Sequence, residues 1–182
     1  MTNKTHWTAV AVVPPEGVWS PVQAIRKRHD RKFSRWMPHL NLLYPFRPAE
    51  QFGEAARRLT EVSSAIAPFP LALADFRSFT HGPESFTIWL APESPEPVRL
   101  LQAALQAEFP DCDEVSRFPS GFTPHLSVGQ APSEQALARL LAALRSDWKP
   151  IRFEVSEIAL VRREAEGPFR IERTIALGRS AG

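Results

Sequence analysis

A short motif that occurs twice constrains the fold of this chain more than any other feature. Residues Met37–Leu42 (MPHLNL) align with residues Thr123–Val128 (TPHLSV). Each copy is followed by a stretch whose apolar residues have helical spacing. Duplication of an ancestral half is the natural explanation, and two related halves can face one another across a cleft.

The motif predicts a polar face and an apolar face on each strand. Side chains of a strand alternate between its two faces. His39 and Asn41 therefore share one face, as do His125 and Ser127, while the apolar residues between them point toward the core. Each half is expected to present an imidazole beside an uncharged hydrogen-bond donor.

The rest of the chain alternates between strand-like and helix-like segments. We predict strands over 7–13, 39–44, 71–79, 85–90, 125–128, 151–161 and 169–177, and helices over 21–32, 49–66, 97–109 and 133–148. Ser20 and Ser133 are the expected N-caps of the first and last helices, and the turn 81–83 is expected to close a hairpin. This order predicts an α+β or mixed α/β fold with antiparallel pairing.

Composition excludes several classes of protein. The single cysteine, Cys112, rules out an internal disulfide, and no apolar run approaches the roughly 20 residues that span a bilayer. The apolar stretch 9–13 is too short for the core of a signal peptide, so we expect a soluble cytoplasmic protein without membrane contact. The net charge of +2 permits an anionic ligand without requiring one. No phosphate-binding loop, dinucleotide fingerprint or zinc spacing is present.

Paired histidines suit the opening of a cyclic phosphodiester. The reaction needs a base for the attacking water and an acid for the departing sugar oxygen. Imidazole, with an ordinary pKa of about 6.5, can fill either role near neutral pH. Asn41 and Ser127 could donate hydrogen bonds to the phosphate oxygens as charge develops there. None of these roles requires a metal.

Both motifs resemble the paired His-x-Thr/Ser motifs of the 2H phosphoesterase superfamily, in particular its 2′-5′ RNA ligase (LigT-like) branch. The resemblance covers Pro38–Phe46, Phe122–Gly129 and a tail like the family's final hairpin, Ile158–Glu164 followed by Gly167–Phe169. It implies a bilobal α+β fold, with residues 1–182 forming one domain of two intertwined lobes around a central cleft. Asn41 departs from the family pattern, which has Thr or Ser at that position.

The resemblance also implies an activity. Family members hydrolyse 2′,3′-cyclic phosphates to 2′-phosphates, and some join RNA ends through a 2′-5′ linkage without ATP. By this resemblance His125 is the general base and His39 the general acid, although the sequence alone does not fix that polarity. We expect RNA ends or small cyclic nucleotides as partners, no cofactor or metal, and a monomer.

Further residues are weaker candidates for substrate binding. Tyr44 and Phe46 follow the first motif and could stack on a base, although core packing is an alternative for Tyr44. Arg162 belongs to the family-like tail and could reach the cleft. The basic run 26–35, with Phe33 and Trp36, could hold an RNA backbone or form a solvated helix face.

Two other functional hypotheses remain open from the sequence. One is a non-catalytic RNA- or nucleotide-binding module that retains the cleft. The other is a metal-dependent hydrolase in which the histidines are ligands, although no carboxylate lies at ligand spacing near either motif.

Overall fold

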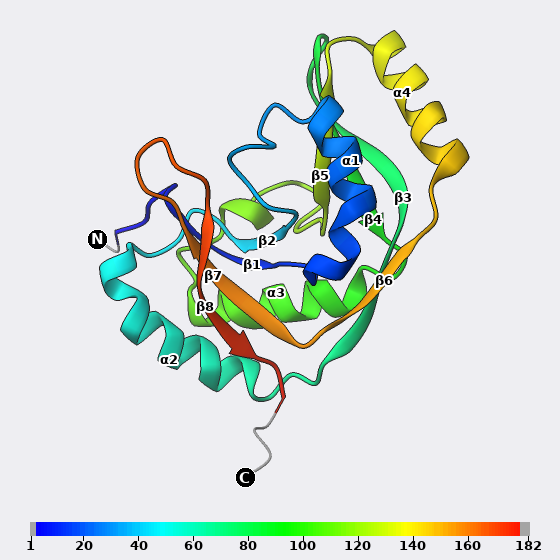
Figure 1. The fold of residues 1–182 in the computed structure, drawn as a ribbon. Coiled ribbons are helices and arrows are strands. Elements are labelled where there is room, and N and C mark those ends of the chain that lie inside the picture. Colours follow the sequence, from blue (N-terminus) through cyan, green and yellow to red (C-terminus); the bar gives the residue numbers. More distant parts are fainter. Residues whose placement is uncertain (1–2, 179–182) are drawn as a thin grey trace.

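A computed structural model describes residues 3–178. Within these residues the chain forms two four-stranded antiparallel sheets and four α-helices, as Figure 1 shows. The predicted α+β class with antiparallel pairing is confirmed.

Each copy of the motif enters a strand at the edge of its own sheet. The first sheet has the order β2-β1-β7-β8 and the second has the order β5-β4-β3-β6. The strands of the first sheet are β1 (Thr8–Val12), β2 (Leu40–Leu43), β7 (Glu157–Arg162) and β8 (Arg170–Ala176). Those of the second are β3 (Phe69–Gly82), β4 (Ser85–Pro92), β5 (Leu126–Ala131) and β6 (Ile151–Val155). The predicted hairpin is formed by β3 and β4.

The prediction of a single strand over 151–161 is wrong. The chain leaves the second sheet after Val155 and enters the first at Glu157, so β6 and β7 belong to different sheets. Val155 and Ile158 are both buried, with two exposed residues between them, so the alternation of a continuous strand is broken here. The C-terminal strands thereby complete a sheet that the N-terminal strands began.

The four helices are α1 (Trp19–His29), α2 (Phe52–Ser63), α3 (Glu96–Glu108) and α4 (Glu134–Asp147). Ser133 caps α4 as predicted, because its side chain accepts a hydrogen bond from the Ala136 amide. The prediction that Ser20 caps α1 is wrong. That helix begins two residues before the predicted Pro21, and its N-cap, Val18, makes no side-chain capping hydrogen bond. The Trp19 indole donates to the Pro14 carbonyl at 2.7 Å.

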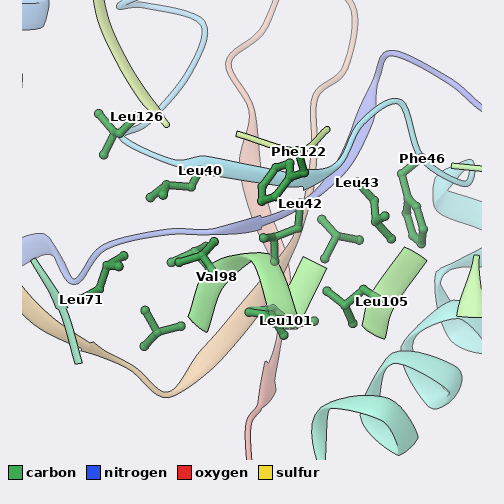
Figure 2. Packing of buried hydrophobic residues seen from close by; sticks show 14 of the residues in the cluster. Leu40, Leu42, Leu43, Phe46, Leu71, Val98, Leu101, Leu105, Phe122 and Leu126 are labelled. Carbon is green, nitrogen blue, oxygen red and sulfur yellow. The ribbon is translucent and has the colours of Figure 1, made fainter. Parts of the chain in front are cut away.

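Two helices pack against a strand of the sheet to which neither of their neighbouring strands in the sequence belongs: each contacts the edge strand that carries the other copy of the motif. Helix α1 connects β1 to β2 but packs against β5, and α3 connects β4 to β5 but contacts β2 (Figure 1). Figure 2 shows the α3 side chain Leu101 lying beneath Leu42 of β2, and Val98 lying beneath Leu40. This exchange of helices ties the two motif strands into one continuous core.

The apolar face of each motif strand packs into that core, as the alternation predicted. Leu40, Leu42, Leu126 and Val128 are fully buried, whereas Asn41 and Ser127 are only partly buried. Burying a leucine side chain contributes about 1.5–3 kcal/mol, so these residues fix the strands firmly and orient their polar faces.

No helix within residues 3–178 is long and apolar enough to cross a membrane.

Candidate active site

His39 and His125 occupy equivalent positions, each immediately before its edge strand. The Nδ1 atom of His39 lies 2.8 Å from the carbonyl oxygen of Met37, and that of His125 lies 2.8 Å from the carbonyl oxygen of Thr123. Because a carbonyl can only accept, Nδ1 must carry the proton in both rings. In the neutral rings, Nε2 is therefore the nitrogen that can accept a proton.

The proline in each motif supports this geometry. Pro38 and Pro124 lie between the histidine and the carbonyl that anchors its ring. Proline has a fixed φ, which restricts the turn between that carbonyl and the imidazole. The carbonyl sets the tautomer, and the repeated Pro-His dipeptide limits the orientation of the ring.

The two histidines line a single cavity of about 530 Å³. Asn41 and Tyr44 line it from the first motif, and Ser127 lines it from the second. Five residues predicted from the sequence to form a site are therefore brought together, although the two motifs lie in different sheets.

The structure does not bring the other two predicted residues to this cavity. Phe46 is fully buried in the core, where its ring meets that of Phe109 edge-on at 5.1 Å. Arg162 forms ion pairs with Glu164 and Glu172 on the C-terminal hairpin. Strand alternation could not place Phe46, because β2 ends at Leu43.

Aromatic rings surround the two imidazoles in different ways. Trp36 stacks on His39 with ring centroids 4.1 Å apart, and Phe169 stacks on the other face of the indole at 3.5 Å. His125 instead meets Phe79 and Trp89 edge-on, at 4.9 and 5.9 Å. Trp36 follows the basic run 26–35 and is a predicted candidate for stacking on a base. The sequence gives no sign that Phe79 lies near the site, because Phe79 is far from either motif in the chain.

The cavity wall also holds a polar group formed by Arg26, Asp30 and Gln130. Arg26 begins the predicted basic run 26–35, whereas Asp30 and Gln130 were not predicted as site residues. A β-bulge explains Gln130. Val128 and Gly129 are both buried, and the register of β4 with β5 shifts at this point. The shift places Gln130, rather than Gly129, on the same face as Ser127.

Burial favours the neutral form of both imidazoles. Burial, together with the positive charge of Arg26 and the neighbouring His125, lowers the pKa of His39 to about 4, against the opposing effects of the Met37 carbonyl and Asp30. Burial also lowers the pKa of His125, against the effect of the Thr123 carbonyl. A bound anion would oppose these shifts, because a nearby negative charge favours the protonated ring.

The amide of Asn41 has an unsatisfied atom. Its Oδ1 is buried and has no hydrogen-bond partner among the described residues. Rotation of the amide exchanges its oxygen with its NH₂ group, so the same position can offer a donor to a ligand. Within residues 3–178 no cluster of three or more His, Cys, Asp or Glu residues could hold a metal ion.

Comparison with known proteins places this geometry in context. A family model described as the 2′-5′ RNA ligase superfamily matches residues 14–167. A protein of Geobacillus kaustophilus named "Putative phosphoesterase GK0864" is 25% identical over 172 residues, covering 93% of this chain and 95% of the relative.

Solved structures share the fold. E. coli LigT complexed with phosphate has a TM-score of 0.63 and 17% identity, covering 97% of this chain and 100% of the other. E. coli LigT complexed with 3′-AMP has a TM-score of 0.60 and 19% identity, covering 96% and 99%. The LigT-like fold expected from the motifs is therefore confirmed.

Proposed function

Because this chain belongs to the 2′-5′ RNA ligase superfamily, we propose that it is a phosphoesterase that hydrolyses 2′,3′-cyclic phosphates at RNA ends to 2′-phosphates. One observation carries the proposal: His39 and His125 line the same cavity from two different sheets, with identically anchored rings. The proposal takes residues 1–182 as one domain of two intertwined lobes, with the cavity between them.

The two imidazoles divide the proton transfers. Nε2 of His125 takes a proton from water as the water oxygen attacks phosphorus. The bond between phosphorus and the 3′ oxygen breaks, and Nε2 of protonated His39 gives its proton to that oxygen. The product carries a 2′-phosphate and a 3′-hydroxyl. The substrate anion favours protonation of one ring, against the effect of burial, which favours the neutral form.

Asn41 and Ser127 bind the non-bridging phosphate oxygens. Both line the cavity, and each lies two residues after the histidine of its motif. Each half of the chain therefore supplies one imidazole and one uncharged donor. Uncharged donors stabilise the developing charge without competing with the histidines for protons. The unsatisfied amide of Asn41 supports this role.

The same site would also open the cyclic phosphate with a sugar hydroxyl in place of water. The 5′-hydroxyl oxygen of an RNA acceptor attacks phosphorus of the cyclic phosphate, and its proton passes to Nε2 of His125. The 3′ oxygen leaves as before and a 2′-5′ linkage forms. The energy comes from opening the strained ring, so ATP is not needed.

Product analysis with an RNA oligonucleotide that ends in a 2′,3′-cyclic phosphate tests the proposal. We expect a 2′-phosphate product, and a joined product when a 5′-hydroxyl acceptor is added. His39→Ala and His125→Ala should each lower turnover about a hundred- to ten-thousand-fold. His6→Ala is the matched control, because His6 is exposed and does not line the cavity.

Three outcomes would contradict the proposal. Near-wild-type turnover in either cavity variant would refute the acid/base roles. Tight binding of the oligonucleotide without any product would favour a non-catalytic binding module. Loss of activity on chelation would favour a metal-dependent hydrolase.

A further inference from the structure

Arg26 is a charged side chain buried in the cavity wall. It is only 2% exposed and lines the same cavity as the two histidines. Its Nε donates to Oδ2 of Asp30 at 2.9 Å, and its Nη1 donates to Oε1 of Gln23 at 2.9 Å. Among residues 3–178 no acceptor takes a hydrogen bond from Nη2. One edge of the guanidinium is thus left for a ligand.

Asp30 fixes this guanidinium relative to the second motif strand. Its Oδ1 accepts hydrogen bonds from the backbone N of Lys32 at 2.9 Å and from Nε2 of Gln130 at 3.2 Å. Gln130, on β5, in turn accepts a hydrogen bond from the Arg31 amide at 2.9 Å. The end of α1 is therefore tied to the strand that His125 precedes.

Close packing strengthens the same connection. A Cβ atom added to Gly129 would lie 2.7 Å from Cβ of His29 and 3.0 Å from its carbonyl oxygen. Only glycine allows α1 to approach β5 this closely. The position of Arg26 is thus set by contacts between α1 and the strand of the second motif.

Charge balance explains what such an arginine could do. An anion that enters a partly buried site loses hydration and needs a compensating charge. Asn41 and Ser127 are uncharged, and burial favours neutral imidazoles. Lys32 also lines the cavity but is exposed. Arg26 is the buried permanent cation in the wall; Asp30 balances its charge, so what it offers a ligand is the N–H groups of Nη2, and a guanidinium matches the geometry of phosphate oxygens.

We propose that Arg26 binds the phosphate group in the cavity through its Nη2 edge, held in place by Asp30 and Gln130. The identity of the natural substrate rests on the proposed function, but the binding of a phosphate anion does not. Arg26 adds a third kind of contact with the phosphate, in addition to the two histidines and the two uncharged donors.

Phosphate binding by a charge-neutral double variant tests the proposal. Arg26→Gln combined with Asp30→Asn removes both charges and keeps hydrogen-bonding amides, so no buried charge is left unpaired. Calorimetry with inorganic phosphate should show an affinity about ten- to a hundred-fold lower than in the wild type. Arg28→Gln, an exposed position on the same helix, is the control and should bind normally.

The pH profile gives a second readout that a purely structural role would not move. Besides burial and the Met37 carbonyl, the titratable groups that act on the pKa of His39 are Arg26, His125 and Asp30, and the effect of Arg26 exceeds that of Asp30. Removing both charges should therefore raise the pKa of His39 in the profile of kcat/KM. KM for the cyclic substrate should rise together with the phosphate dissociation constant.

Wild-type phosphate affinity in the double variant would overturn the proposal, as would a wild-type protein that binds no phosphate. If the variant fails to fold, NMR of the Arg26 guanidinium in the wild type decides. Its resonances should move on titration with phosphate, and unchanged resonances at saturation would overturn the proposal. Arg26-dependent phosphate binding without cyclic-phosphate turnover would support this inference while refuting the proposed function.

Discussion

The indole of Trp36 lies flat against the imidazole of His39, with the ring planes 17° apart. Phe169, in the C-terminal hairpin, stacks on the opposite face of the indole. The indole is therefore packed between Phe169 and His39. An aromatic face attracts a cation placed over it, so this stack favours the protonated ring and opposes the effect of burial. His125 has only edge contacts from its aromatic neighbours and lacks this support.

Replacing Trp36 should lower both stability and turnover. Trp36 is 8% exposed, and truncation of a buried tryptophan to alanine costs about 3–5 kcal/mol of unfolding free energy. Trp36→Phe keeps a stacking ring and should retain most of the turnover that Trp36→Ala loses. Urea denaturation and kcat on a cyclic-phosphate substrate measure the two effects. Equal kcat in both variants would show that the stack does not matter for His39.

Acid should destabilise the protein through His39. The unfolded imidazole has a pKa near 6.5, whereas that of folded His39 is about 4, so the unfolded state takes up its proton first as the pH falls. The free energy of unfolding should therefore fall between about pH 6.5 and pH 4. Denaturation of the wild type and of His39→Gln across this range checks the effect. The variant should show a shallower dependence, and parallel curves would contradict the prediction.

Gly129→Ala should disturb the contact between α1 and β5. The added methyl group would collide with His29, and overpacking of this kind costs about 1–3 kcal/mol. Because the contact positions Arg26, turnover should fall as well. Gly53→Ala is the matched control, since a Cβ there meets nothing within 4 Å. Alanine favours a helix, so this variant should be unchanged or up to about 1 kcal/mol more stable by thermal denaturation.

Asn41 should show opposite effects on stability and activity. Its buried Oδ1 lacks a partner, so Asn41→Leu removes an unsatisfied polar atom and should stabilise the protein by about 1 kcal/mol. The same change removes a phosphate donor and should lower kcat by about a hundred-fold or more. Asn41→Thr keeps a donor and should retain activity. An active Asn41→Leu variant would exclude the proposed role of this amide.

The local pattern of the sequence was sufficient for much of the fold. The alternation around His39 and His125 correctly assigned the buried leucines and the polar face of each motif strand. The capping serine of α4 and the β3–β4 hairpin were also predictable. These features depend on residues close together in the chain, so their signal lies within a short window.

Only the tertiary structure decided which residues share the cavity and which do not. Arg26 and Asp30 reach it because α1 packs against the opposite sheet, and Gln130 reaches it through a bulge. Phe46 enters the core instead, and 151–161 divides between two sheets. Each of these outcomes depends on contacts between segments far apart in the chain. Periodicity records which face of an element is apolar, but it does not record which distant element will cover that face.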